Sequence, residues 1–277
     1  MTKFNNSNKL SITGLILTYN EEIHIDRCIK SISKFVDEIF IIDSFSNDNT
    51  IKKARKYKKV KIFKRQFIHQ ADQMNWALKN LQFKTDWIFR IDADEYIYKS
   101  KKNLFKNNLN DKRINGYIID RKIKFLGKNI NYGVTSPHKT LRLWRKGMAH
   151  YPNVSMDEHA VVKGRTSSLN IMIIDDNLYG FSYWVKKHIN YSVREANEYL
   201  KLNEKNYKYD RSKANKLQKN QIYYNFPIFI RPFLLFIYSY FLKLGFLTGL
   251  RGFVFYFFQN LLYRLLVDTN IFLKKFK

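Results

Sequence analysis

The fold is decided by residues 10–95, whose apolar runs read LSITGLIL (10–17), VDEIFIID (36–43), VKIFK (60–64) and WIFRID (87–92). Runs of this length and composition are typical of buried strands. Helical patterns between them predict three helices, over residues 21–33, 51–57 and 71–81. Strands that alternate with helices form sheets covered by helices, so the sequence predicts an α/β fold with a Rossmann-like, mostly parallel sheet.

Polar clusters follow three of the predicted strands directly, at Thr18–Glu22, Asp43–Thr50 and Asp92–Glu95. In parallel α/β sheets ligands bind at the carboxyl ends of the strands, so this topology brings the three clusters together. Asn20 is a suitable N-cap for the first helix. Tyr19 suits two roles, packing on a nucleobase or lying in the core.

Carboxylates in these clusters predict a metal and a nucleotide. Asp92 and Asp94 leave a strand at positions i and i+2, so both can reach one hydrated cation. Mg²⁺ and Mn²⁺ prefer oxygen ligands and share their shells with phosphates and water. Asp43 can accept a hydrogen bond from a base or a ribose hydroxyl, as acids do in other nucleotide-binding folds. The predicted cofactor is therefore Mn²⁺ or Mg²⁺.

Composition limits the class of protein. The formal net charge is +27, which favours association with polyanions such as nucleic acid, anionic lipid or phosphorylated substrates. No zinc-ligand pattern or recognition helix is recognisable, so nucleic acid is not an expected partner. A single cysteine, Cys28, excludes an internal disulfide, and we expect it in the core of the first helix. The first nine residues lack an apolar run, so no secretory signal is expected.

The rest of the chain predicts further short strands and one long helix. The strands are predicted at residues 116–125, 139–144, 161–162 and 171–174, and the helix at 181–205. We expect a catalytic domain over residues 1–220 and a helical segment over 221–277. From Ile222 onward this segment holds seven Lys or Arg residues and one acid, Asp268. Two amphipathic helices in a membrane interface fit this pattern, and a pair of aromatic core helices is the alternative.

Four motifs resemble the family 2 glycosyltransferases in order and spacing. They are TYNEE (18–22), DSFSNDNT (43–50), QMNWAL (73–78) and RIDADE (90–95). The resemblance covers residues 10–95 and implies an A-type glycosyltransferase fold, inversion at the sugar, and a metal. It implies that Asp43 and Asp92 bind the nucleoside and that Asp94 holds the metal, with Asp92 as a second candidate ligand. Further candidate residues for the nucleotide sugar are Thr18, Tyr19, Asn20, Glu21, Gln73 and Asn75.

Later motifs are similar to a branch that builds lipopolysaccharide, O-antigen or capsular sugars. They are LRLWR (141–145), MDEH (156–159) and WVKKHINY (184–191). An inverting transfer needs a base for the acceptor hydroxyl proton. The resemblance places Glu158 there, but the Asp157-Glu158 pair is reversed relative to many members, so Asp157 stays open as the base. His159 is a candidate ligand of the metal.

Two arginines lie on the strand predicted at residues 139–144 and its end. Arg142 and Arg145 are three residues apart, so they lie on opposite faces of the strand. One of them can reach a diphosphate or an anionic acceptor, and we choose Arg142. The other is expected in solvent.

These features together predict a metal-dependent inverting glycosyltransferase of the hexosyltransferase class. The expected donor is a nucleotide sugar, with UDP favoured by the habit of the family. The expected acceptor is a glycan or a lipid-linked glycan in bacterial surface polysaccharide or lipopolysaccharide synthesis. The expected location is cytoplasmic, peripheral on the inner face of the plasma membrane. The alternative is a basic nucleic-acid-binding or membrane-associated protein without catalysis.

Overall fold

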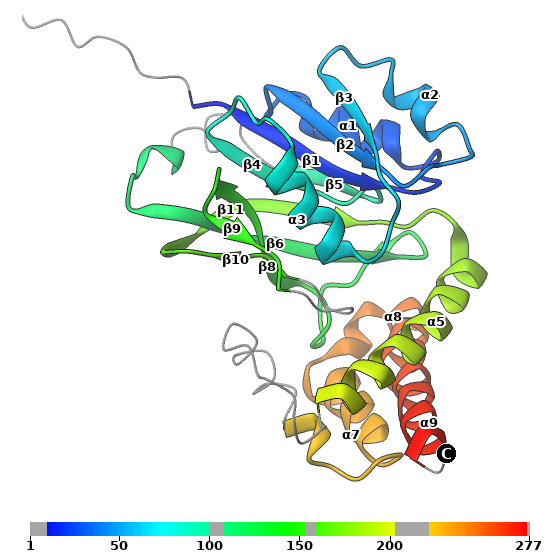
Figure 1. The fold of residues 1–277 in the computed structure, drawn as a ribbon. Helices are drawn as coiled ribbons and strands as arrows, with labels where there is room; N and C mark the ends of the chain where they lie inside the picture. The colour runs from blue at the N-terminus through cyan, green and yellow to red at the C-terminus, as the bar shows by residue number, and fades with distance from the viewer. Residues whose placement is uncertain (1–9, 100–107, 153–158, 203–221, 276–277) are drawn as a thin grey trace, which may run out of the picture. The chain divides into compact units, whose positions relative to one another are not determined.

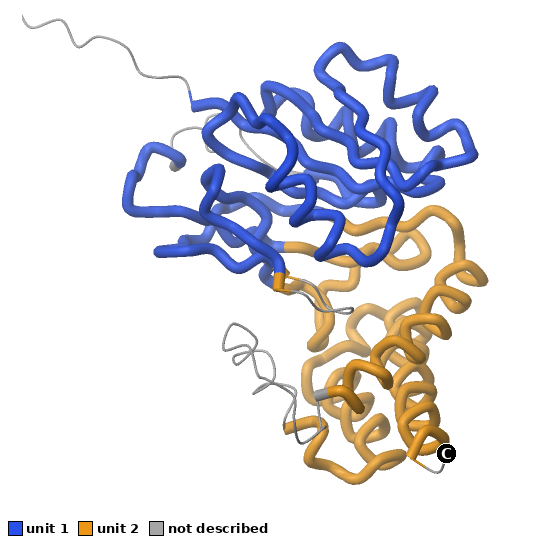
Figure 2. Tube along the Cα trace, in the orientation of Figure 1, with its two compact units in different colours: residues 1–120, 139–151, 160–173 blue, residues 121–138, 152–159, 174–277 orange. Residues whose placement is uncertain are grey.

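The computed structural model describes residues 10–99, 108–152, 159–202 and 222–275. The chain divides into two compact units (Figure 2). Unit 1 comprises residues 1–120, 139–151 and 160–173, and unit 2 comprises residues 121–138, 152–159 and 174–277. The predicted domain boundary at residue 220 stays a prediction.

The predicted alternation of strands and helices is confirmed in unit 1 (Figure 1). Its strands are β1 (Ile12–Thr18), β2 (Glu38–Asp43), β3 (Val60–Lys64) and β4 (Trp87–Arg90). Its helices are α1 (Ile25–Ile32), α2 (Thr50–Ala54) and α3 (Gln70–Asn80). The four strands are parallel in the order β3-β2-β1-β4. Their carboxyl ends therefore meet at one edge of the sheet.

The sheet continues beyond β4 through strands that come later in the chain. The later strands and the short helix η1 are β5 (Glu95–Lys99), η1 (Asn108–Asn110), β6 (Ile114–Phe125), β7 (Lys128–Asn129), β8 (His138–Arg145) and β11 (Arg165–Asp175). The order is β3-β2-β1-β4-β8-β6-β11-β5, with β8 antiparallel to β4 and β7 paired to β6. A separate two-stranded sheet joins β9 (Ala149–His150) and β10 (Val161–Val162).

Alternating side chains of β1 enter two apolar cores. Ile12 and Ile16 pack in the cluster that contains α1, whereas Leu15 packs in the cluster that contains α3. Successive strand residues face opposite sides of a sheet, so α1 and α3 cover opposite faces. α1 approaches β1 closely because Gly14 has no side chain; a Cβ there would lie 2.9 Å from Cδ1 of Ile32.

Cys28 lies on α1 and is fully buried, as the sequence predicts. Its Sγ atom lies 3.5 Å from the backbone oxygen of Asp92. Burial raises the pKa of the thiol well above its usual value, and the nearby carboxylates of Glu95, Asp92 and Asp94 raise it further. A thiol that stays protonated is a poor nucleophile, so Cys28 is a core residue.

Unit 2 contains the long predicted helix and the C-terminal helices. These elements are α5 (Gly180–Leu202), α7 (Arg231–Ile237), η3 (Tyr238–Leu242), η4 (Gly245–Thr248), α8 (Leu250–Tyr256), η5 (Phe257–Leu262) and α9 (Tyr263–Lys275). α5 packs on α9 through a cluster formed by Ala196, Tyr263, Val267 and Ile271. Within the described ranges, no helix is both long enough and apolar enough to cross a bilayer.

Candidate functional site

The ends of β1 and β2 are joined by a buried hydrogen bond. Thr18 and Asp43 are register partners, and Oγ1 of Thr18 donates to Oδ2 of Asp43 at 2.8 Å. The backbone N–H of Ser46 donates to the other carboxylate oxygen at 2.9 Å. Asp43 is fully buried, so these donors stabilise its charge and fix its orientation. Two predicted nucleotide-binding residues, Thr18 and Asp43, are therefore in contact.

The loops after β1 and β2 are tied to each other. The backbone N–H of Asn20 donates to Oγ of Ser46 at 2.9 Å, and that of Glu21 donates to Oγ1 of Thr50 at 2.7 Å. Oδ1 of Asn20 accepts the backbone N–H of Asn47 at 3.0 Å. These bonds hold the first two polar clusters as one rigid rim.

Asn20 does not cap the first helix, and that prediction was wrong. α1 begins at Ile25, with His24 at the N-cap position, and Asn20 has a φ of +55°. The side chain of Asn20 instead accepts a hydrogen bond from the loop after β2, so it stabilises the rim and not the start of the helix. Glu21 contacts Nδ1 of His24 through Oε2 at 2.6 Å, which orders the turn that precedes α1.

The side chain of Tyr19 is 60% exposed. Of the two roles considered from the sequence, a position in the core is therefore excluded. It lies in the loop that follows Thr18. An exposed aromatic ring in this loop offers a face on which a planar base can stack.

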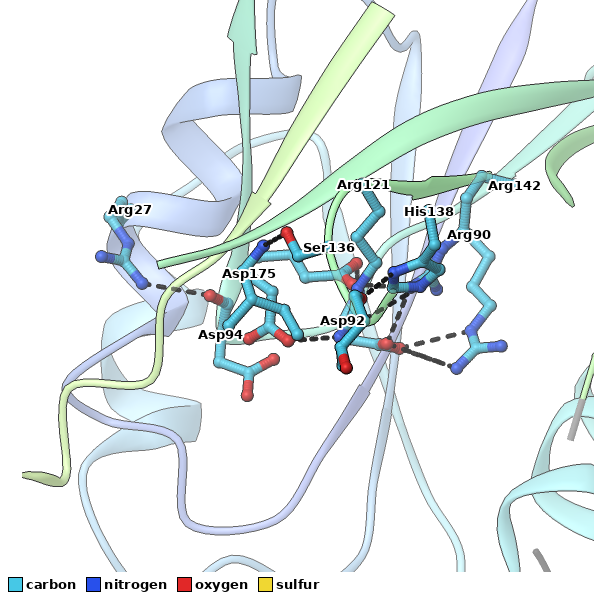
Figure 3. Close-up of polar contacts among 12 residues, drawn as sticks. Arg27, Arg90, Asp92, Asp94, Arg121, Ser136, His138, Arg142 and Asp175 are labelled. Carbon is cyan, nitrogen blue, oxygen red and sulfur yellow. Dashed lines mark hydrogen bonds and ion pairs between the residues drawn. The ribbon is translucent and has the colours of Figure 1, made fainter. Parts of the chain in front are cut away.

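Two arginines flank Asp92 at the end of β4 (Figure 3). Nη2 of Arg90 lies 3.0 Å from Oδ1 of Asp92, and Nη2 of Arg142 lies 3.1 Å from Oδ2. The same Nη2 atom of Arg142 lies 2.5 Å from Oε1 of Glu95, which also accepts the backbone N–H of Asp92 through Oε2 at 3.0 Å. Both arginines and Glu95 are buried, whereas Asp92 is partly exposed. The network therefore exposes the carboxylate of Asp92 and buries the other three charged groups.

Charge balance within this network keeps Arg90 ionised. Burial alone would lower the pKa of Arg90, but the charges of Asp92 and Glu95 and the contact with Tyr151 together outweigh it, so the pKa is raised. Burial raises the pKa of Tyr151, whose hydroxyl accepts from Nη1 of Arg90 at 3.4 Å. Arg90 and Glu95 were not among the predicted site residues. The sequence did contain a clue to both residues. Each is a charged residue in or next to an apolar strand, and a charged side chain that is buried there needs a partner of opposite charge.

Arg142 has hydrogen-bond donors to spare. Its side chain is 4% exposed, and its Nε and Nη1 atoms are buried without an acceptor among the residues that the structure describes. A buried donor left without an acceptor costs about 1–3 kcal/mol, so the site favours an added acceptor such as a phosphate or carboxylate oxygen. These unused donors are consistent with the prediction that Arg142 binds a diphosphate or an anionic acceptor.

Arg145 is not solvated, and that prediction was wrong. Its Nε donates to the backbone oxygen of Ile114 at 3.0 Å, and its Nη2 donates to that of Asp111 at 3.0 Å. Its guanidinium also lies over the ring of Trp87 at 4.5 Å. Arg145 thus joins β8 to the start of β6.

Gln73 and Asn75 on α3 bind the protein backbone and neighbouring side chains. Nε2 of Gln73 donates to Oγ of Ser44 at 3.1 Å, and its Oε1 accepts from Nη1 of Arg65 at 2.9 Å. Asn75 makes two bonds to Tyr151: its Nδ2 donates to the backbone oxygen at 2.7 Å, and its Oδ1 accepts the backbone N–H at 2.9 Å. Gln73 therefore positions the loop after β2 and Asn75 positions the chain after β9, and direct contact of either amide with a nucleotide sugar stays a prediction.

Asp94 and His159 are the other predicted metal ligands. Asp94 is partly exposed after β4, where its backbone oxygen accepts from Nη2 of Arg27 at 3.1 Å, and His159 is exposed. No group of three or more His, Cys, Asp or Glu residues that could hold an ion occurs among the described positions. Mg²⁺ sites on nucleotides need only one or two carboxylates, because phosphates and water complete the shell. The carboxylates after β4 therefore fit a cation shared with a diphosphate.

The two candidate bases, Asp157 and Glu158, lie outside the described residues. Their roles stay predictions. The chain that leads to them is held at Tyr151 by Asn75.

Comparison with known proteins gives a family and several relatives. The family described as "Glycosyl transferase family 2" matches residues 15–159, a span that contains every strand-end cluster above. The chain is 24% identical to the glycosyltransferase RT0209 of Rickettsia typhi, over 88% of this chain and 80% of that protein. It is 29% identical to the lipopolysaccharide core biosynthesis glycosyltransferase LpsC of Rhizobium meliloti, over 52% of this chain and 54% of that protein. The crystal structure of S. aureus TarS 1–349 in complex with UDP aligns with a TM-score of 0.46 and 16% identity, over 68% of this chain and 66% of that chain.

Proposed function

Because this chain belongs to glycosyl transferase family 2, we propose that it binds a nucleotide sugar at the carboxyl ends of β1, β2 and β4. It transfers the sugar with inversion to a glycan or a lipid-linked glycan. The observation that carries this proposal is the juxtaposition, within unit 1, of a partly exposed Asp92 and a buried Arg142 that has unused donors. A diphosphate supplies the acceptor oxygens that Arg142 lacks.

The nucleoside is assigned to the rim formed by the loops after β1 and β2. Asp43 is held by Thr18 and Ser46 with a fixed orientation, which suits recognition of a base N–H or a ribose hydroxyl. The exposed ring of Tyr19 offers a surface on which the base stacks. Asn20 and Glu21 shape this rim through their backbone bonds.

A divalent cation, Mn²⁺ or Mg²⁺, would be held by Asp94, with Asp92 and His159 as further candidate ligands. Bound there, it would neutralise charge on the departing diphosphate. Arg142 adds a fixed positive charge beside Asp92 without any proton transfer.

The transfer needs one proton acceptor on the protein. The oxygen of the acceptor hydroxyl bonds to the anomeric carbon, while the bond from that carbon to the diphosphate breaks and the nucleoside diphosphate leaves with the electron pair. The hydroxyl proton goes to Glu158, with Asp157 as the alternative base. By fixing Tyr151, Asn75 anchors the chain that leads to this pair.

Two observations support the proposed acceptor and the proposed location of the enzyme. LpsC, a relative over about half of this chain, is a lipopolysaccharide core biosynthesis glycosyltransferase. The helical segment after residue 221 exposes many large apolar side chains and is rich in basic residues. We therefore place the enzyme on the cytoplasmic face of the plasma membrane, with residues 1–220 as the catalytic domain and 221–277 as the membrane-associated segment. The reaction then belongs to lipopolysaccharide or surface polysaccharide synthesis.

A donor screen tests this function. The full-length protein is mixed with each UDP- and GDP-sugar in the presence of Mn²⁺, and thermal shift and release of nucleoside diphosphate are measured. We expect one donor, most simply a UDP-sugar, to raise the unfolding temperature and to be hydrolysed slowly without acceptor. Failure of every nucleotide sugar to bind would refute the proposed donor class.

A further inference from the structure

The helix formed by α7 and η3 (residues 231–242) exposes large apolar side chains and buries polar ones. Its exposed large apolar residues are Phe233, Leu234, Ile237, Tyr238, Phe241 and Leu242. Steps of one, three and four residues place all six on one face of the helix. Ser239 lies on the opposite face and is buried, and Arg231 is buried at the start of the helix. A helix on a water-facing surface has the reverse arrangement.

Two contacts between buried polar side chains link the helices of unit 2 in this region. Arg231 forms an ion pair with Asp268 of α9, and both side chains are buried. Nδ2 of Asn260 donates to Oγ of Ser239 at 2.7 Å, also out of solvent. The helices are therefore held together in part by polar contacts, while large apolar side chains face outward. This is the distribution expected where the surrounding medium is apolar.

The exposed apolar surface is densest in residues 241–250, which we call the apolar tip. Its exposed large side chains are Phe241, Leu242, Leu244, Phe246, Leu247 and Leu250, of which Leu250 is 78% and Leu242 is 70% exposed. The backbone turns sharply here, with positive φ at Leu244 and at Gly249. The tip therefore presents leucine and phenylalanine side chains on a compact turn.

Basic side chains border the apolar tip. Lys243 and Arg251 are exposed, and Nζ of Lys128 lies near Gly249, at 3.6 Å from the position of an added Cβ. Nζ of Lys243 lies 5.4 Å from the ring centre of Tyr238, so the amine runs back along the helix and away from the turn. A lysine can reach the headgroup layer in this way while its stem stays among acyl chains.

We propose that the apolar tip inserts into one leaflet of an anionic bilayer, with Lys128, Lys243 and Arg251 at the lipid headgroups. This rests on the membrane attachment proposed above and specifies which residues enter the lipid. An amphipathic element of this kind reaches about 5–10 Å below the headgroups. A second copy of the chain suits this surface less well, because both partners would bring the same positive charges together.

A matched pair of double variants tests the insertion by flotation with vesicles of phosphatidylglycerol and phosphatidylethanolamine. Leu242→Ser/Leu247→Ser removes two tip side chains that are 70% and 51% exposed. Phe67→Ser/Ile68→Ser removes two from unit 1 that are 42% and 68% exposed. All four side chains are exposed, so neither variant removes a fully buried side chain. We expect the tip variant to lower the vesicle partition coefficient at least tenfold and the matched variant to change it less than twofold.

Site-specific fluorescence gives a second readout. Cys28 is buried with a raised pKa, so a cysteine introduced at Leu247 in the full chain can be labelled selectively with an environment-sensitive dye. Leu247→Cys should show a blue shift with the vesicles and quenching by lipids brominated on their acyl chains. The control, Lys79→Cys on the exposed side of α3, should show neither.

The outcomes separate the two proposals. If the wild-type protein does not float with anionic vesicles, the membrane attachment itself is refuted. If it floats and the tip variant floats equally well, or the dye at position 247 stays in water, attachment stands and insertion of the tip is refuted. If sedimentation shows a lipid-free dimer that the tip variant dissociates, the surface is an interface between copies and the proposal is overturned. The sugar-transfer proposal is tested separately by the donor screen.

Discussion

The Nη2 atom of Arg142 lies 2.5 Å from Oε1 of Glu95, and both side chains are buried. This contact turns the guanidinium toward Asp92, which is the carboxylate that the site presents at its surface. Glu95 also accepts the backbone N–H of Asp92, so one buried acid fixes both partners. Glu95 is thus a positioning residue for the site.

Replacing Glu95 by alanine should destabilise the protein. It leaves Arg142 with a buried charge that has lost its closest partner, and loss of one member of a buried pair costs about 3–5 kcal/mol. Urea denaturation followed by circular dichroism measures the change. Lys61→Ala is the control, because it breaks an exposed pair with Glu38 and should cost less than about 1 kcal/mol. Equal losses in the two variants would contradict the role of Glu95.

Replacing Asn75 by alanine should affect both stability and turnover. It removes two hydrogen bonds to the backbone of Tyr151, which together contribute about 1–3 kcal/mol. Because this anchor precedes the candidate bases, we expect kcat to fall more than donor affinity does. Asn80→Ala is the control, since its amide donates to the backbone oxygen of Trp76 on an exposed helix turn. A kcat equal to that of the control would show that the anchor is not needed.

Much of the fold was predictable because its signals are local. The apolar runs of β1 to β4 identify strands without any knowledge of their neighbours. The antiparallel entry of β8 beside β4 depends on pairing between distant segments, and no local pattern encodes it. The start of α1 was misjudged because Asn20 bonds to the loop after β2, a contact across 27 residues.

The candidate site was predictable to the extent that it lies at strand ends. Thr18 and Asp43 were predicted to meet there, and they do. The buried residue Glu95 was not predicted as part of the site, because its burial depends on pairing with Arg142, which is 47 residues away in the sequence. Arg145 was misassigned for the same reason, since its acceptors are backbone oxygens more than 30 residues away.

Substitution of the two candidate bases should separate their roles. A base acts in the transition state, so Glu158→Gln should lower kcat strongly with little change in donor affinity. Asp157→Asn is the matched variant and should retain most of the activity. Initial rates and donor titrations measure both. An inactive Asp157→Asn with an active Glu158→Gln would assign the base to Asp157, and full activity in both would remove the pair from the mechanism.

Salt should weaken membrane attachment only in part. Raising the ionic strength from about 0.1 M to 1 M shortens the Debye length from about 10 Å to about 3 Å, which screens the basic residues. The apolar contribution of the exposed side chains is not screened. Flotation with anionic vesicles at both salt concentrations should therefore show reduced but persistent binding. Complete release at high salt would mean that attachment is electrostatic alone.

The most direct test of the central claim is the rate of nucleoside diphosphate release from the donor that the screen selects, with wild-type protein and Asp94→Asn in Mn²⁺. Asp94 supplies the carboxylate proposed to hold the cation, and it is partly exposed whereas Arg142 and Glu95 are buried, so its substitution should leave the fold intact. We predict turnover by the wild type and a loss of at least 100-fold, roughly 2.7 kcal/mol of transition-state stabilisation, in the variant and in excess EDTA. Full activity of a folded Asp94→Asn, or of the wild type in EDTA, would contradict the account.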